Sequence, residues 1–454
     1  MRRYLCLSVF LCGSLFSQTL EKDLQRLTDE VGGRRTGSPA MRRAVTWGVD
    51  AFKQAGVDRV TTEAFKVPQA WSEGPTRLDI LGAASFRART VAIGWSPATP
   101  AEGLTARVVD AGEGSVANFQ KLGDAGKDAF VLIHSGLLHK WEDLFGEYMN
   151  APGVIERATG AGAKGILWMS SREKTLLYRH VGTMAGKVEG LPQAIVARED
   201  ALRIARLIAA GSTVRAKLTM PNVVGGPFEQ RNVVAEIRGT EKPDEVVILG
   251  AHLDSWELGT GALDNGCNSA LVVDVARRIK AAGAPKRTVR FILFSGEEQG
   301  MLGSQAYVKA HAGEMDKIVA IVIHDTGSGK MTGYSLGGRA DIKDAVSAIL
   351  PGEHTLDAIL GTDNLDFLLA GVPNLVANQV EANYLENYHA SSDTYDKVDF
   401  PTLNEITASA LKVVTGIANL PERIGKRQSK AEVQKLLRDT GLDQQMKLFG
   451  IKER

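Results

Sequence analysis

Residues 246–327 decide the fold, because three short apolar runs within them are each followed at once by polar residues. The stretch begins VVILGAHLDSWELGTGALDNGCNSALVVDVARRIK (246–280), continues with TVRFILFSGEEQGMLGS (288–304) and ends with IVAIVIHDTG (318–327). Apolar runs of this length, rich in β-branched residues, predict buried strands, and the amphipathic segment after the first run predicts a crossover helix. The polar residues that follow the runs are His252, Asp254, Glu297, Glu298 and Asp325. An open α/β sheet binds its ligands beyond the carboxyl ends of its strands, so we expect these side chains to meet there.

The composition limits the class of protein. With 454 residues, 44% of them hydrophobic and 24% charged, the chain is long enough for a large core and more than one domain. Its 54 basic and 53 acidic residues nearly cancel. Nucleic acid and anionic membranes, which require a basic excess or a basic patch, are therefore excluded as main partners.

The pattern of residues 1–17 predicts a secretory signal peptide. A basic Met-Arg-Arg start precedes an apolar run that ends near Phe16 and is too short to span a bilayer. An uncleaved anchor is the alternative. Cys6 and Cys12 lie in this segment, so Cys267 alone remains in the mature chain and no intramolecular disulfide can form. We expect a secreted or periplasmic protein without membrane contact beyond the signal peptide.

The rest of the chain divides into four segments. Residues 18–103 predict the first part of a catalytic domain, and the loop SPATPAEG (96–103) marks its end. Residues 104–222 alternate short strands with Gly-rich turns and carry no cluster of His, Asp and Glu at strand ends, which favours an inserted domain. The catalytic domain resumes over 223–424, and the charged tail 425–454 is most simply a solvated helix. The predicted fold is α/β, with a central mixed, mostly parallel sheet flanked by helices and an inserted domain.

The groups available for chemistry are all imidazoles or carboxylates. Such ligands suit zinc, cobalt or manganese, and the absence of Cys among them argues against a closed structural zinc site. A carboxylate that bridges two ions needs a tight loop, and Asp264 lies in the glycine-flanked GALDNG. The adjacent Glu297 and Glu298 point to different sides of a strand end, so one can bind a metal while the other acts as a base. Any one of these residues alone is more often a cap or a satisfied core group. Their occurrence at consecutive strand ends favours a metal site.

As a set, the motifs resemble those of the co-catalytic zinc exopeptidases, the family of bacterial leucine-type aminopeptidases and plasma glutamate carboxypeptidase. The matching motifs are VGGRRTGSPA, GAHLDSW, GALDNG, FSGEEQGMLGS, HDTG and YHASSDT. The resemblance covers nearly the whole mature chain. It implies the zinc exopeptidase fold, an inserted protease-associated-like domain, and hydrolysis of terminal peptide bonds in dipeptides or short peptides.

The resemblance also implies two zinc ions per chain and a role for each matching residue. The implied ligands are His252 and Asp325 on one ion, Glu298 and His389 on the other, and Asp264 between them. Glu297 would be the general base. Asp254 would orient the imidazole of His252 without binding the metal itself. In this family a cis peptide bond commonly follows the bridging residue, so we expect one at Asp264–Asn265.

The polarity of the substrate stays open. Asp363 and Asn364 in GTDNLDF are candidates to hold an α-amine, whereas Arg339 in LGGRA would hold a carboxylate bidentately. Tyr388 is a further candidate for substrate binding. Aminopeptidase, carboxypeptidase and dipeptidase therefore all remain open, with a peptide as the partner and a homodimer compatible with the sequence.

Two other classes share the fold that the resemblance implies. A glutaminyl cyclase would use one zinc, and a measured metal stoichiometry near two would weigh against it. A receptor-like binding module would lack metal ligands. All five ligand positions are occupied in this chain, which weighs against an inert module.

Overall fold

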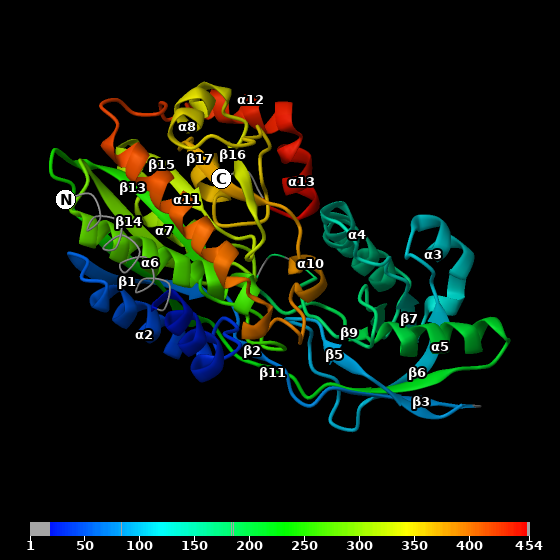
Figure 1. The fold of residues 1–454 in the computed structure, drawn as a ribbon. Helices are drawn as coiled ribbons and strands as arrows, with labels where there is room; N and C mark the ends of the chain where they lie inside the picture. The colour runs from blue at the N-terminus through cyan, green and yellow to red at the C-terminus, as the bar shows by residue number, and fades with distance from the viewer. Residues whose placement is uncertain (1–18, 83, 183, 185, 452–454) are drawn as a thin grey trace.

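A computed structural model describes residues 19–451, with the exception of residues 83, 183 and 185. The signal peptide predicted at residues 1–17 lies outside the described residues. Figure 1 shows two units side by side, each built on its own sheet. Within the described residues, no helix is long and apolar enough to cross a membrane.

The main unit contains a seven-stranded mixed sheet. In spatial order its strands are β1 (Arg59–Val67), β12 (Phe228–Ile237), β14 (Arg287–Phe294), β13 (Lys242–His252), β15 (Ile318–Ile323), β17 (Asn374–Gln379) and β16 (Met331–Ser335). The four strands from β14 to β17 are parallel, whereas β1, β12 and β16 pair antiparallel. The three strands predicted from the apolar runs are therefore neighbours, and their carboxyl ends share one edge.

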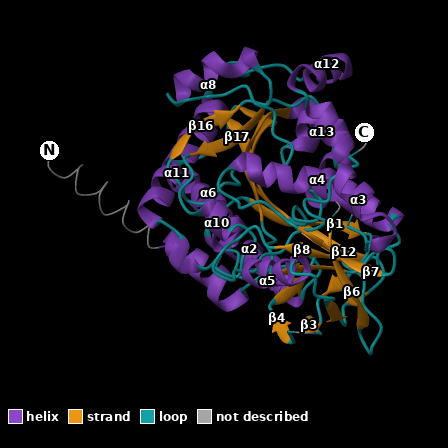
Figure 2. Cartoon of the chain, turned by 90° about the vertical axis from the view of Figure 1, so that its right-hand side faces the viewer, coloured by secondary structure: helices purple, strands orange, loops and turns teal. Residues whose placement is uncertain are grey.

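Helices cover both faces of the main sheet (Figures 1 and 2). Successive residues of β13 alternate between these faces, as the strand period of two requires. Val247 and Leu249 pack in the core beneath α2 (Pro39–Gln54), α6 (Cys267–Ala282) and α11 (Phe400–Asn419). Ile248 packs on the other face with residues of α7 (Leu302–Ala310) and α9 (Leu365–Leu369). The α/β architecture predicted from the sequence is confirmed.

The second unit contains an eight-stranded sheet. In spatial order its strands are β4 (Phe86–Ala88), β3 (Arg77–Leu81), β10 (Arg215–Thr219), β6 (Leu104–Asp110), β7 (Ala129–Ile133), β8 (Gly165–Met169), β9 (Gln193–Val196) and β5 (Thr90–Ala92). Its helices are α3 (Val116–Leu122), α4 (Trp141–Gly160) and α5 (Arg198–Ala209). The strands β3, β4 and β5 precede the boundary expected at residues 103 and 104, yet they pair within this sheet. Sequence spacing gave no indication of these pairings, and the division into domains stays a prediction.

The C-terminal segment is packed rather than solvated. Its helices α12 (Lys430–Thr440) and α13 (Leu442–Leu448) bury apolar side chains against residues of α9 and of the loop before it. The buried residues of this segment are Val433, Leu436, Leu437, Leu442, Met446 and Ile451. The expectation of a solvated tail over 425–454 was therefore wrong for the described part. Charged residues between the apolar positions hid a helical apolar face.

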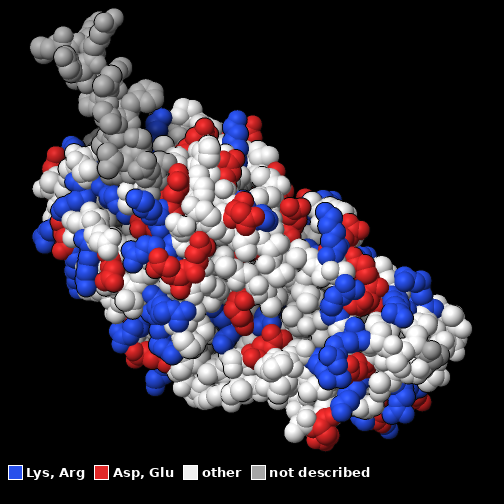
Figure 3. All heavy atoms as spheres, turned by 60° about the horizontal axis from the view of Figure 1, so that its bottom comes forward, with Lys and Arg blue, Asp and Glu red and all other residues white. Residues whose placement is uncertain are grey.

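Basic and acidic side chains are interspersed on the face shown in Figure 3, as their nearly equal numbers in the sequence suggest.

Candidate metal centre

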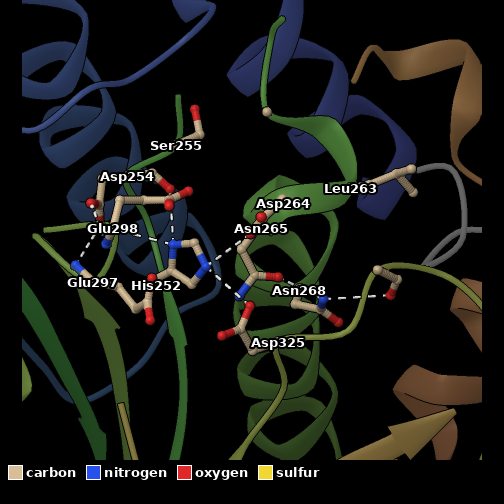
Figure 4. Close-up of polar contacts among 12 residues, drawn as sticks. His252, Asp254, Ser255, Leu263, Asp264, Asn265, Asn268, Glu297, Glu298 and Asp325 are labelled. Atoms are coloured by element: carbon tan, nitrogen blue, oxygen red, sulfur yellow. Dashed lines mark hydrogen bonds and ion pairs between the residues drawn. The ribbon is translucent and has the colours of Figure 1, made fainter. Parts of the chain in front are cut away.

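Five side chains converge at the carboxyl edge of the parallel strands. Figure 4 shows four of them, those of His252, Asp264, Glu298 and Asp325. His252 ends β13, Glu298 follows β14 and Asp325 follows β15. Asp264 lies in the segment η3 (Ala262–Gly266) that precedes α6, where its own backbone is not helical, and His389 follows α10 (Tyr384–Asn387). All five ligand candidates from the sequence are thus brought together, and the peptide bond Asp264–Asn265 is cis, as expected.

The carboxylate of Asp264 is shared between two groups of ligands. Its Oδ1 lies 3.1 Å from Nε2 of His252, which in turn lies 3.0 Å from Oδ1 of Asp325. Its Oδ2 lies 3.2 Å from Nε2 of His389, which lies 2.9 Å from Oε2 of Glu298. In each group the three candidate ligand atoms lie within 4.8 Å of one another. The arrangement therefore offers two cation sites with one carboxylate in common.

The electrostatics of the cluster favour added positive charge. Burial alone would lower the pKa of His252, but Asp325 and Asp264 outweigh it and raise the pKa well above its usual value. Burial is likewise outweighed at His389, whose pKa is raised to about 9 by Glu298 and Asp264. Burial raises the pKa of the Glu298 carboxyl to about 7, although His389 opposes the shift. Three carboxylates face two imidazoles in a buried site, so bound cations would replace these protons.

The donor set fits a pair of zinc ions. Imidazole nitrogen and carboxylate oxygen are ordinary ligands of catalytic zinc. Oε1 of Glu298 is buried and has no hydrogen-bond partner. A buried oxygen without a partner is costly unless something else binds it, and a cation at this position would do so.

Glu297 lies beside the cluster and is outside both groups of ligand atoms. Its side chain is partly exposed, whereas Glu298 next to it is buried. Burial of its carboxyl raises the pKa of Glu297 well above the usual value, His252 opposes this, and Asp325 adds to it. The adjacent glutamates therefore lie in different environments, as a ligand and a base require.

The contacts of Asp254 differ from the expectation. Nδ1 of His252 lies 3.0 Å from the main-chain carbonyl oxygen of Asp254, and 3.9 Å from its carboxylate. That carboxylate instead accepts hydrogen bonds from the backbone N–H groups of Gly296 (2.8 Å), Glu297 (3.3 Å) and Glu298 (3.4 Å). The hydroxyl of Thr36 donates to it as well (2.9 Å). The side chain of Asp254 thus fixes the loop that carries both glutamates, while its main chain orients the imidazole.

Two residues that the sequence did not single out hold the loop of the shared carboxylate. Asp393 accepts hydrogen bonds from the N–H groups of Leu263 (2.7 Å) and Asp264 (3.1 Å). The buried guanidinium of Arg34 donates to the carbonyl groups of Leu253 (2.7 Å), Thr260 (2.7 Å) and Gly261 (2.8 Å). Arg34 lies in the motif VGGRRTGSPA and Asp393 in YHASSDT, so these motifs were the sequence signal for both residues. The spacing of residues along the chain does not reveal their contacts.

The four candidates for substrate binding lie in different places. Arg339 pairs with Asp341 (2.7 Å) and donates to the carbonyl of Lys426 (2.8 Å). Its partners lie outside the ligand cluster, and its role in substrate binding stays a prediction. Asn364 is fully buried and donates to the carbonyl of Ile359 (3.1 Å). Its contacts too are structural.

Asp363 and Tyr388 lie nearer the ligands. Asp363 is 0% exposed, and burial raises its pKa to about 8 although His252 opposes the shift. A carboxyl with no exposed surface is poorly placed to reach a substrate. Tyr388 is partly exposed, and its ring stacks on His389 with 3.6 Å between the ring centroids. Of the four candidates, Tyr388 alone combines contact with a ligand residue and exposure.

Two cation sites that share a carboxylate, with a free glutamate beside them, are the arrangement of co-catalytic metallohydrolases. Together with this fold, the centre defines a zinc metallopeptidase. Residues 232–414 match the model of Peptidase family M28. All five candidate ligands lie within the matched residues, so the match supports a zinc exopeptidase centre of this family.

Known proteins similar to this chain are peptidases by name. Carboxypeptidase Q of Xenopus laevis is 28% identical over 415 residues, which cover 88% of this chain and 86% of the relative. A peptidase M28 precursor from Shewanella amazonensis SB2B superposes with a TM-score of 0.82 at 26% identity, over 92% of this chain and 98% of that one. A zinc aminopeptidase from Bacillus subtilis shares the fold, with a TM-score of 0.70 at 19% identity over 91% and 98% of the two chains.

Proposed function

We propose that the protein is a secreted or periplasmic exopeptidase that uses two zinc ions to hydrolyse the terminal bond of dipeptides or short peptides. The observation that carries the proposal is the shared carboxylate of Asp264, with one oxygen toward His252 and the other toward His389. The basic and apolar pattern of residues 1–17 supports the location.

The ligands of the two ions follow from the two groups of side chains. His252 and Asp325 would hold one ion, Glu298 and His389 the other, and Asp264 both. When bound, such a pair acidifies a shared water and polarises the carbonyl of the scissile bond.

Glu297 is the residue that moves protons. It is partly exposed, and burial raises its pKa, with His252 opposing and Asp325 adding to the shift, as suits a group that accepts and returns a proton. It would take the proton of the attacking water and deliver it to the nitrogen of the leaving amine. Asp254 fixes its backbone N–H and so sets the direction of the side chain.

Tyr388 would orient the substrate. Its hydroxyl is the polar end of a partly exposed side chain that stacks on His389. A hydroxyl at this position can donate to the scissile carbonyl oxygen as negative charge develops there.

The charges near the centre favour a substrate with a free α-amine close to the cleaved bond. Arg339, the candidate for holding a carboxylate, is engaged by Asp341 and Lys426. Glu297, which belongs to neither ligand group, stays partly exposed beside the ligand cluster. Acidic groups attract an ammonium and repel a carboxylate.

The test combines elemental analysis of the purified protein with a panel of one dipeptide in its free, N-acetylated and C-amidated forms. We expect two zinc ions per chain, turnover of the free and the C-amidated dipeptide, and little turnover of the N-acetylated one. The reverse preference would make the enzyme a carboxypeptidase. One zinc with cyclisation of an N-terminal glutamine would indicate a glutaminyl cyclase, and no zinc with no turnover would indicate a binding module.

A further inference from the structure

The loop that carries His389 is anchored by the second unit, not by the main unit alone. The N–H of Arg179 donates to the carbonyl of His389 (3.1 Å), and the N–H of Ser391 donates to the carbonyl of Leu177 (3.1 Å). The guanidinium of Arg172 donates to the carbonyl of Tyr388 (3.2 Å). Residues 170–179, which follow strand β8 of the second unit, therefore hold the backbone on both sides of His389.

The imidazole of His389 also meets a side chain of the second unit. Its Nε2 faces Asp264 and Glu298, whereas its Nδ1 lies 3.4 Å from the hydroxyl of Tyr148 on α4. The hydroxyl of Tyr148 lies 3.1 Å from that of Tyr388. An imidazole that offers Nε2 to a cation keeps its proton on Nδ1, so Nδ1 would donate to Tyr148 and leave the tyrosine proton free for Tyr388.

Helix α4 is built to hold Tyr148 at this position. Its first half packs on the main core, where Leu144 is buried and Trp141 stacks on Tyr384 with 5.5 Å between ring centroids. Its second half packs on the second sheet through Val154 and Ala158. The helix thus spans both cores, and Tyr148 lies where they meet.

The neighbours of Tyr148 restrict it further. The adjacent Glu147 accepts hydrogen bonds from Ser171 (2.8 Å) and Tyr178, and lies 3.1 Å from Nε2 of His180. The ring of Tyr148 lies 5.2 Å from that of His180 and 6.3 Å from that of Phe449 in the packed C-terminal segment. A side chain held on a helix by such contacts loses little further freedom when it hydrogen-bonds the imidazole.

We infer that Tyr148 is a positioning residue supplied by the second unit, which sets the orientation of His389 for the ion shared with Glu298. The inference rests on the ligand role of His389 in the proposed function. Partners behind a metal-binding imidazole typically change metal affinity or activity by ~10- to 100-fold. The second unit is therefore part of the metal centre rather than an accessory to it.

The test uses the full-length protein, stripped of metal and titrated with zinc in competition with a chromophoric chelator. His389→Ala first identifies which of the two binding steps belongs to the His389 side. Tyr148→Phe, which removes one oxygen and keeps the ring, is expected to weaken that same step by ~10- to 100-fold and to leave the other step unchanged. In the loaded enzyme we expect kcat to fall while KM stays within about twofold.

The matched control is Tyr307→Phe. Tyr307 is buried, and its hydroxyl accepts a hydrogen bond from Arg290, away from the ligand cluster. This variant should leave both zinc affinities unchanged. A Tyr148→Phe protein with both binding steps intact, or with the opposite step weakened, would overturn the inference while the function stands. If His389→Ala still bound two ions with full affinity, the ligand assignment of the proposed function would fail together with it.

Discussion

The imidazole of His252 is oriented by the main chain of Asp254 and not by its carboxylate. Nδ1 of His252 lies 3.0 Å from the main-chain oxygen and 3.9 Å from the carboxylate oxygen. The carboxylate instead accepts hydrogen bonds from the backbone N–H groups of the loop from Gly296 to Glu298. Asp254 therefore connects His252, a candidate ligand of one ion, with the proposed base Glu297 and with Glu298, a candidate ligand of the other ion.

Asp254→Asn tests this division of roles. The amide retains only one acceptor oxygen and turns an NH₂ toward backbone donors, so the loop of Glu297 should shift. We expect kcat to fall by ~10- to 100-fold, while zinc at His252 is retained because the main-chain contact remains. Steady-state kinetics and elemental analysis check this. Thr36→Val, which removes one donor to the same carboxylate, should cause a smaller loss. The opposite result would contradict these roles: an Asp254→Asn protein that binds less zinc, but whose zinc-loaded molecules keep full activity.

Glu297→Gln separates metal binding from proton transfer. The amide is nearly isosteric but cannot accept the proton of the attacking water, so kcat should fall by ~10²- to 10⁴-fold. Two zinc ions should still bind, because Glu297 belongs to neither ligand group. Glu314→Gln, at a side chain that is 44% exposed, serves as the control and should retain activity. A Glu297→Gln enzyme with near-normal kcat would remove the base from the mechanism.

The convergence of the ligands could be predicted because it follows from local patterns. Each apolar run was long and regular enough to identify a strand, and parallel strands deliver their next residues to one edge. His252, Glu298 and Asp325 follow directly from this. Asp264 and His389 lie in loops, and they needed the resemblance of whole motifs to be placed.

The surroundings of other residues depend on tertiary contacts that no local pattern contains. The sequence offered Arg339 in LGGRA as a residue to hold a substrate carboxylate, and the fold brings the carbonyl of Lys426 to it. The sequence did not single out Tyr148, because it belongs to a segment without clustered ligands and the role inferred for it depends on the packing of α4 against both cores. The strand β5 pairs with β9, which lies about a hundred residues further along the chain.

The packed C-terminal segment predicts a clear contrast between two leucines of α13. Leu442 is 0% exposed, whereas Leu448 is 51% exposed. Leu442→Ala should lower the free energy of unfolding of this segment by about 2–5 kcal/mol through lost burial and a cavity. Leu448→Ala should change it by less than about 0.5 kcal/mol. Limited proteolysis within residues 425–451 measures the difference, and equal cleavage rates for the two variants would argue against a packed segment.

The buried carboxyls predict how the stability of the metal-free protein depends on pH. Burial raises the pKa of Asp363 to about 8 and that of Asp393 to about 7, and the acidic neighbours of His389 raise its pKa to about 9 against the effect of burial. In this range the folded chain binds protons that the unfolded chain has released, so the free energy of unfolding falls as pH rises. Burial lowers the pKa of His324 to about 3. Its titration therefore changes the free energy of unfolding only below about pH 6.5, where the imidazole of the unfolded chain titrates. Calorimetry in the presence of a chelator should therefore show a lower melting temperature at about pH 8.5 than at about pH 6.5.

Zinc and one substitution should each remove part of this decline. Zinc binds the deprotonated ligands, so its affinity rises with pH and the loaded protein should not lose stability over the same range. Asp363→Asn removes a proton-binding group that is not a ligand, and should reduce the slope of the metal-free protein. Asp128→Asn, at a side chain that is 68% exposed, should leave the slope unchanged. If the metal-free protein instead became more stable toward alkaline pH, the prediction would be wrong. Stability rises with pH only when groups release protons on folding, so these carboxyls would then already be ionised in the folded protein.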